Sequence, residues 1–261
     1  MDDFYDKVGA ASKLEDEARE RRCSGTDTYT ATFQHLADLE LEGSTVTEIG
    51  ACRKNWKLCV PCEEDGVLDE VVFGVQGVLT NVNLVPITVG KMDPRRAIRL
   101  TQRVEIAGLG TPTFEEALRK LESAHDQFSE HFCGQDIGKI DPQNGEFGRA
   151  LACSNRVFTM RADYPTEQST EFEAGVDPLG SLEKLSTKDL FHGPGNVVKY
   201  FRRATDPKGG GRIFDSGFPG SFKVGDLVEI QGSITIPLRS SDEAGRQQEA
   251  SNAYRVDKMQ S

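Results

Sequence analysis

Two segments of the chain alternate apolar and polar residues, and this pattern limits the fold more than any other feature. In residues 98–106 and 227–236, apolar side chains such as Val104 and Ile230 fall on one side, and charged or polar side chains fall on the other. Successive side chains of a β-strand point to opposite faces of the sheet, so this period predicts strands with one face in the core and one in solvent. The sequence therefore predicts a β-rich body.

One segment shows the period of a helix instead. From Thr113 to Phe132, apolar residues recur at spacings of three and four, which places them in one stripe along a helix. Thr113 can cap the first free N–H groups while Glu116 reaches back, as in a capping box, and Gly134 follows as a C-terminal cap. We predict a helix over 113–132 that packs this stripe on the sheet.

The order of these elements indicates the fold class. Strands and helices do not alternate along the chain, which disfavours parallel βαβ architecture and favours a mainly β (α+β) fold. We expect a β-sandwich or jelly-roll-like body with the long helix packed on it. The 261 residues divide into a charged N-terminal helix or tail over 1–25, a single β-rich domain over 26–237, and a polar, disordered tail over 238–261. The length alone is compatible with one domain or two.

The charge balance bears on the partners and on the compartment. The chain has 42 acidic and 31 basic residues, a formal charge of −11, so its overall field repels polyanions. The N-terminal residues are acidic and polar, unlike a secretory signal. Glycine, asparagine and proline interrupt the longest apolar stretch, 71–89, so no membrane span is expected. We expect a soluble intracellular protein of the cytoplasm or nucleus, with reduced cysteines.

Three fragments near the C-terminal end occur in a distinctive order. They are Asp177-Pro178-Leu179-Gly180, then His192 with Asn196-Val197-Val198-Lys199-Tyr200-Phe201, then Phe222-Lys223-Val224-Gly225-Asp226-Leu227-Val228-Glu229. This order of DPxG, HxxxNxVxY and FxxGDxVE resembles that of uncharacterised β-rich proteins of mushroom-forming (basidiomycete) fungi. The resemblance covers residues 177–237. It implies a fungal origin and a shared β-rich module, with no established activity and no catalytic residue.

The third fragment also has a structural explanation. Gly225 and Asp226 are typical turn residues. A turn at this point sends the flanking Phe222 and Val228 into the core. We therefore interpret the fragment as a turn rather than as a ligand site.

The cysteines offer one candidate metal site. Cys59 and Cys62 form a CxxC pair, and Cys52 precedes Cys59. Two such thiolates can hold zinc, but a structural zinc site needs four ligands, and the sequence has no second pair. Cys52, Cys59 and Cys62 are thus a zinc candidate, with free or buried thiols as the alternative. No other cofactor is expected.

A basic cluster offers one candidate contact for phosphate or nucleic acid. It consists of Arg95, Arg96, Arg99 and Arg103, the last two on the solvent face of the first predicted strand. Arginine side chains bind phosphate groups through paired hydrogen bonds. The alternative, which we favour, is that these arginines pair with surplus acidic residues of the same protein.

No pattern of catalytic residues stands out. The sequence has neither a Gly-x-Ser-x-Gly elbow nor a glycine-rich phosphate loop, so catalytic residues remain unknown. We favour a non-catalytic binding or interaction module, with a protein partner rather than nucleic acid. One alternative is a metal-dependent enzyme on a jelly-roll-like scaffold, although the four histidines lack the spacing of an iron-binding triad. The other is a nucleic-acid-associated protein that acts through the basic cluster.

Overall fold

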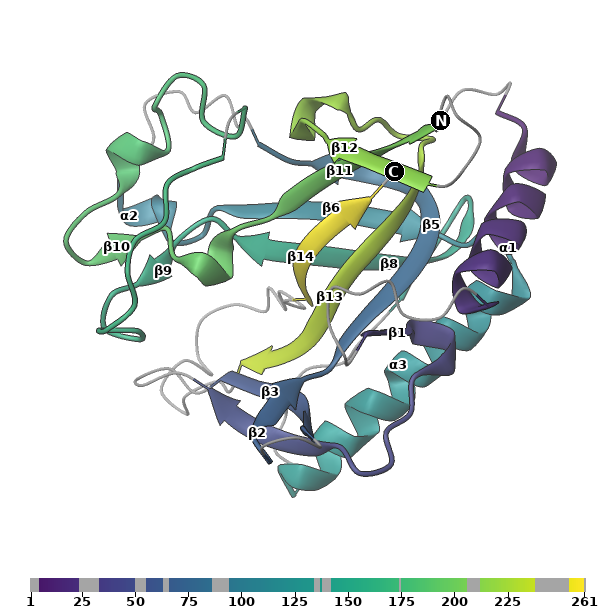
Figure 1. Ribbon diagram of the computed structural model, residues 1–261, viewed down its shortest axis with the longest axis horizontal. Coiled ribbons are helices and arrows are strands. Elements are labelled where there is room, and N and C mark those ends of the chain that lie inside the picture. The colour runs from purple at the N-terminus through teal and green to yellow at the C-terminus, as the bar shows by residue number, and fades with distance from the viewer. Residues whose placement is uncertain are drawn as a thin grey trace.

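The computed structural model of the protein contains one large bent sheet of twelve strands with helices packed on it (Figure 1). It describes residues 5–23, 33–49, 55–62, 66–85, 94–133, 137, 142–173, 175–205, 212–237 and 254–260. The strands of the large sheet are β1 (Phe33–His35), β2 (Thr45–Ile49), β3 (Asn55–Pro61), β4 (Leu68–Glu70), β5 (Val72–Asn83), β6 (Thr101–Ala107), β7 (Gln143–Gly145), β8 (Gly148–Arg156), β11 (Lys199–Thr205), β12 (Arg212–Ser216), β13 (Leu227–Pro237) and β14 (Tyr254–Gln260).

Helices and short elements complete the chain. The α-helices are α1 (Lys7–Cys23), α2 (Pro94–Ala97) and α3 (Pro112–His131), and a separate two-stranded sheet consists of β9 (Thr159–Met160) and β10 (Leu190–Phe191). Four 3₁₀ turns are η1 (Leu36–Asp38), η2 (Glu183–Leu185), η3 (Pro194–Asn196) and η4 (Pro219–Ser221). The mainly β, α+β prediction with one long helix on the sheet is confirmed. No helix among the described residues is both long and apolar enough to span a membrane.

The sheet is centred on β13 and β5. Its main path runs β12, β11, β14, β13, β5, β6, β8 and β7, while β1 joins β5 and β3 joins β13. The pairing of β13 with β14 shifts register at one point, where the consecutive residues Gln231 and Gly232 of β13 face Lys258 and Val256 of β14. The pairing of β13 with β5 continues to Gly232 without a shift, and β13 then pairs with β3 through residues 235–237. The strand β13 therefore belongs to both parts of the sheet.

The prediction for β13 is right about the strand and wrong about one of its faces. Val228, Ile230 and Ile234 are buried in the core, as the alternation predicts. Gln231 and Ser233, on the face predicted to meet solvent, are also buried. Other parts of the chain cover this polar face, and its side chains bond to one another and to those covering residues.

The other predicted strand, β6, begins later than the pattern indicates. Residues 98–100 form a turn after the short helix α2, and the strand begins at Thr101. From there the alternation holds, because Val104 and Ile106 are buried and Arg103 is exposed.

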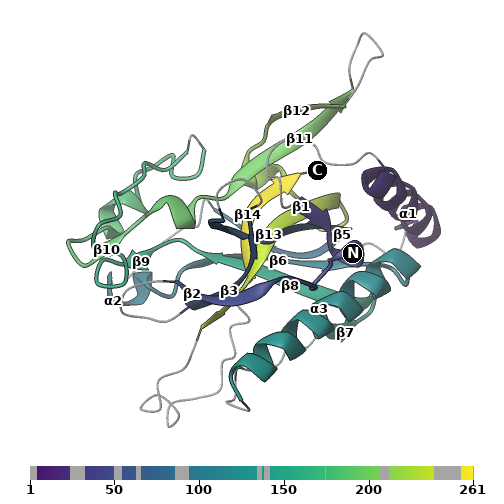
Figure 2. The ribbon, with the colours of Figure 1, turned by 60° about the horizontal axis from the view of Figure 1, so that its bottom comes forward.

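The long helix α3 carries the apolar stripe predicted for it. Phe114, Leu118, Leu121 and Phe128 are buried in the same core cluster as the sheet residues. Figure 2 shows α3 running along one side of the sheet. The predicted helix over 113–132 is confirmed to within one residue at each end.

The start of α3 differs from the predicted capping box. Thr111 precedes the helix without a side-chain capping bond, and Pro112 occupies the first turn. Thr113 instead donates from its backbone N–H (3.4 Å) and its hydroxyl (2.5 Å) to the Glu15 carboxylate of α1. Glu15 of α1 therefore accepts the hydrogen bond from the Thr113 N–H that the capping box would assign to Glu116.

The charged N-terminal segment is a packed helix. Leu14, Ala18 and Arg21 are buried, and they recur along α1 at spacings of four and three. Such spacing places them on one face. The expected helix over 1–25 is present in its described part, but it is not solvated on all sides.

The C-terminal segment contains a strand. Residues 254–260 form β14, which pairs with β13 on one side and with β11 on the other. The disordered tail predicted over 238–261 is therefore wrong for residues 254–260, because backbone hydrogen bonds to two neighbours hold them in the sheet. Residues 238–253 lie outside the described residues.

Candidate functional site

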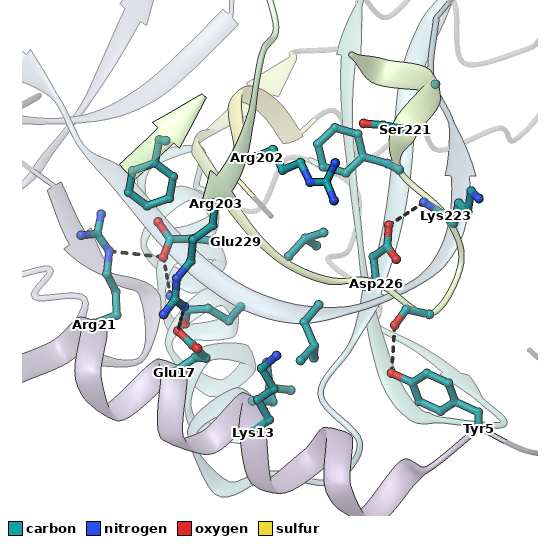
Figure 3. A pocket seen from close by; sticks show the side chains of 18 residues that line it. Tyr5, Lys13, Glu17, Arg21, Arg202, Arg203, Ser221, Lys223, Asp226 and Glu229 are labelled. Atoms are coloured by element: carbon teal, nitrogen blue, oxygen red, sulfur yellow. Dashed lines mark hydrogen bonds and ion pairs between the residues drawn. The ribbon is translucent and has the colours of Figure 1, made fainter. Parts of the chain in front are cut away.

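An open cavity of about 1080 Å³ lies between α1, the start of β13 and the hairpin β11–β12 (Figure 3). The chain segments around it are far apart in the sequence. Its lining residues are Tyr5, Lys13, Leu14, Glu17, Arg21, Gln76, Arg202, Arg203, Phe214, Gly220, Ser221, Phe222, Lys223, Gly225, Asp226, Leu227, Val228 and Glu229.

A largely shielded carboxylate on β13, that of Glu229, lies at the floor of the cavity. Its oxygens accept hydrogen bonds from Gln76 Nε2 (2.6 Å) and Gln231 Nε2 (2.7 Å). Arg21 Nε lies 3.2 Å from the same carboxylate, and only 7 % of the Arg21 side chain and 12 % of the Glu229 side chain are exposed. Because a charge that is shielded from water needs a counter-charge and hydrogen bonds, these contacts offset the cost of burying the carboxylate.

The hydrogen-bond chain continues from this carboxylate to a buried histidine. The Ala37 N–H donates to His35 Nδ1 (3.1 Å), so the ring proton is on Nε2, which donates to Gln76 Oε1 (2.7 Å). Burial lowers the pKa of His35, which favours this neutral ring. The chain ties β1, β5, β13 and α1 together beneath the cavity.

The cavity is locally basic although the protein is acidic. Five basic and three acidic side chains line it. Arg21 pairs with Glu229, and Arg203 Nη1 lies 2.5 Å from a carboxylate oxygen of Glu17. The other three basic side chains are exposed and make no ion pair within the described part of the chain: Lys13, Arg202 and Lys223.

The turn before β13 forms one end of the cavity. Gly225 has a φ of +102°, which favours glycine, and Asp226 Oδ2 accepts the backbone N–H of Lys223 (2.8 Å). The Tyr5 hydroxyl donates to Gly225 O (2.9 Å), and Phe222 is buried. The turn predicted for FxxGDxVE is present, whereas its separation from a ligand site stays untested, because most residues of this fragment, Glu229 included, line the cavity.

The other two fragments of the fungal resemblance make structural contacts. The Asp177 carboxylate accepts three backbone N–H groups, from residues 181–183. His192 Nδ1 donates to Val157 O (2.8 Å), and its ring stacks on Phe172 with centroids 4.2 Å apart. These residues hold loops together at a distance from the cavity lining.

Two of the three candidate zinc ligands lie in the described residues. Cys59 is buried on β3, where burial raises the pKa of its thiol, and Cys62 is partly buried just after the strand. Cys52 lies outside the described residues, within which no three His, Cys, Asp or Glu side chains form a group suited to a metal ion. The zinc site stays a prediction.

The basic cluster predicted from the sequence spreads over three elements. Arg95 and Arg96 belong to α2, Arg99 to the turn after it, and Arg103 to β6. Arg96 and Arg99 are exposed, whereas Arg103 Nη2 lies 2.9 Å from a carboxylate oxygen of Glu105. None of the four is among the cavity-lining residues. The interpretation as internal ion pairs holds for Arg103.

The sequence patterns did not predict the cavity. Its lining comes from residues 5–21, 76, 202–203, 214 and 220–229, and no spacing pattern joins such distant positions. One available signal was a charged residue, Glu229, at an alternating position of a strong strand pattern.

Comparison with known proteins adds no relative from which a function could be transferred. No protein-family model, no curated protein and no solved structure matches the chain.

Proposed function

We propose that the protein is a non-catalytic binding module and that its ligand occupies the cavity between α1, β11–β12 and β13. One observation carries this proposal: a floor held by hydrogen bonds and a shielded ion pair lies under three exposed cations, Lys13, Arg202 and Lys223, that make no ion pair within the described residues. The side chains of the floor are held by one another, so the cavity keeps its shape without a ligand. The exposed cations can bind a ligand without first breaking an ion pair within the protein.

The hydrogen bonding of the floor supports binding rather than catalysis. A general base must be within hydrogen-bond reach of the proton that it removes. The Glu229 carboxylate already accepts from Gln76 and Gln231 and faces Arg21, and both nitrogens of His35 are engaged. These groups stabilise the cavity and are not placed to transfer protons to a ligand.

We also propose that binding takes place inside the cell. Cys59, Cys62, Cys133 and Cys153 are free thiols. Free cysteines are typical of a reducing compartment, whereas exported proteins commonly oxidise them to disulfides.

A fragment screen with a plugged cavity tests the binding function. Gly220 lines the cavity and a Cβ atom added to it meets no atom within 4 Å, so Gly220→Trp adds a bulky side chain to the lining without a clash at its own Cβ. Gly145→Trp is the matched control, because Gly145 lies outside the lining and its added Cβ comes no closer than 3.8 Å to a neighbour.

Ligand-observed NMR with a library of small charged and aromatic fragments is the measurement. We expect fragments that bind to the native protein and to Gly145→Trp, and that lose binding to Gly220→Trp. The proposal is overturned if no fragment binds to the native protein, or if Gly220→Trp binds the same fragments as the native protein.

A further inference from the structure

We infer that the ligand of this cavity is a compact small molecule that carries two or more linked phosphate groups. The inference rests on the proposed function and names the class of ligand. It starts from the three rim cations, Lys13, Arg202 and Lys223, which come from α1, from β11 and from the turn before β13.

The rim cations lie on different sides of one opening. In Figure 3, Lys13 rises from α1 below the cavity, Arg202 enters from β11 above it, and Lys223 lies at the far end beside Asp226. A single anionic group contacts one such side chain at a time unless the cations converge on a point. An anion with several charges spread along its length can bind all three.

The remaining charges of the lining favour an anion over a cation. The carboxylates of Glu229 and Glu17 each face an arginine, so their charges are balanced. Asp226 is the remaining acidic lining residue, and one of its oxygens accepts a backbone N–H. Among the lining residues, three cations without an ion pair therefore outnumber the one remaining carboxylate.

Phosphate suits these side chains better than carboxylate. A phosphate group presents several strong acceptor oxygens and more negative charge than a carboxylate. The planar fork of arginine donates two parallel hydrogen bonds to phosphate oxygens, and lysine binds the same group as a point charge. Arg202 with Lys13 and Lys223 supplies both kinds of contact.

The ligand is a small molecule rather than a nucleic acid for two reasons. The chain carries a formal charge of −11, which repels a long polyanion that extends beyond the cavity. The open cavity of about 1080 Å³ is also close to the upper end of the sizes of small-molecule and cofactor sites.

Calorimetric titration of the full chain tests the inference. The probes are inorganic tripolyphosphate, ATP and inorganic orthophosphate, at about 50 mM salt, where phosphate contacts are strong. Tripolyphosphate and ATP share the linked phosphates, and only ATP adds a base and a sugar. We expect both to bind at least about tenfold more tightly than orthophosphate, because several charges act together.

Charge reversals on the rim test the location. Lys13→Glu, Arg202→Glu and Lys223→Glu change exposed side chains, so the fold should tolerate them. Each should weaken tripolyphosphate binding at least about tenfold, since a nearby charge changes from attractive to repulsive. Lys188→Glu is the control with the same change of net charge, because Lys188 is exposed and does not line the cavity.

Three results would overturn the inference: no binding of tripolyphosphate and ATP, equal affinity for orthophosphate, or an equal loss of binding in Lys188→Glu. Tighter binding of a single-stranded oligonucleotide than of ATP, with the same variant effects, would replace the small molecule by nucleic acid. If polyphosphates do not bind while fragments still occupy the cavity, only the ligand class is wrong and the binding function stands.

Discussion

The guanidinium of Arg21 on α1 and the carboxylate of Glu229 on β13 form an ion pair that is almost completely shielded from water. The two residues are distant in the sequence and meet because α1 packs beside β5, the neighbour of β13, so that Arg21 reaches Glu229. This pair fixes the first helix to the sheet and, with Gln76 and Gln231, forms the floor of the cavity.

Loss of Arg21 should destabilise the protein strongly. Arg21→Met removes the counter-charge and leaves the Glu229 carboxylate buried, which costs about 3 kcal/mol of the free energy of unfolding. Urea denaturation followed by circular dichroism measures this. Arg19→Met, which removes an exposed arginine paired with Asp16, should cost less than about 0.5 kcal/mol. Equal losses in the two variants would contradict the structural role of the pair.

Loss of Glu15 should weaken the start of α3, although Glu15 belongs to α1. Glu15→Ala leaves the N–H and hydroxyl of Thr113 without their carboxylate partner, and we expect a loss of about 1 kcal/mol in the free energy of unfolding, as for a lost helix cap. Asp16→Ala is the control on the exposed side of the same helix. A loss in Asp16→Ala as large as in Glu15→Ala would refute the capping role.

Acidification should destabilise the fold through His35. Burial lowers the pKa of His35 below its ordinary value of 6.5, so below about pH 6.5 the unfolded chain binds a proton that the folded protein does not. The free energy of unfolding should therefore fall as the pH drops from 7 towards 5. Urea denaturation at several pH values should show a shallower fall for His35→Gln. An unchanged slope in His35→Gln would contradict the prediction.

The cysteines should differ sharply in reactivity. Burial raises the pKa of Cys153 to about 12, and only the thiolate reacts with thiol reagents. Cys133 is exposed. In the folded protein at pH 8, peptide mapping after brief treatment with iodoacetamide should show modified Cys133 and unmodified Cys153, with both modified in concentrated urea. Rapid modification of Cys153 in the folded state would show that its environment is more open than described.

The elements that a local pattern specifies were predicted well. In α3, the recurrence of Phe114, Leu118, Leu121 and Phe128 specifies one buried face, and hydrophobic period alone identifies such a helix. In β13, the apolar residues that alternate from Val228 onward do the same for one face of a strand. These features depend on neighbours in the sequence, so the sequence reveals them.

The features that were missed depend on contacts between distant segments. The polar residues of β13 suggested a solvent-exposed face because nothing near them in the sequence shows that Arg21 covers them. The stripe of α1 is too short to stand out among its charges, since it relies on Leu14 and Ala18. The cavity joins such segments, so its residues could not be predicted as a group.

The position of β14 in the sheet sets the order in which the parts of the binding site are synthesised. Among the described strands, β11 pairs only with β12 and β14, and β12 pairs only with β11. The hairpin that carries Arg202 is therefore synthesised before the strand that attaches it to β13. The backbone pairing that joins this wall of the cavity to β13 is therefore completed only when residues 254–260 have been synthesised.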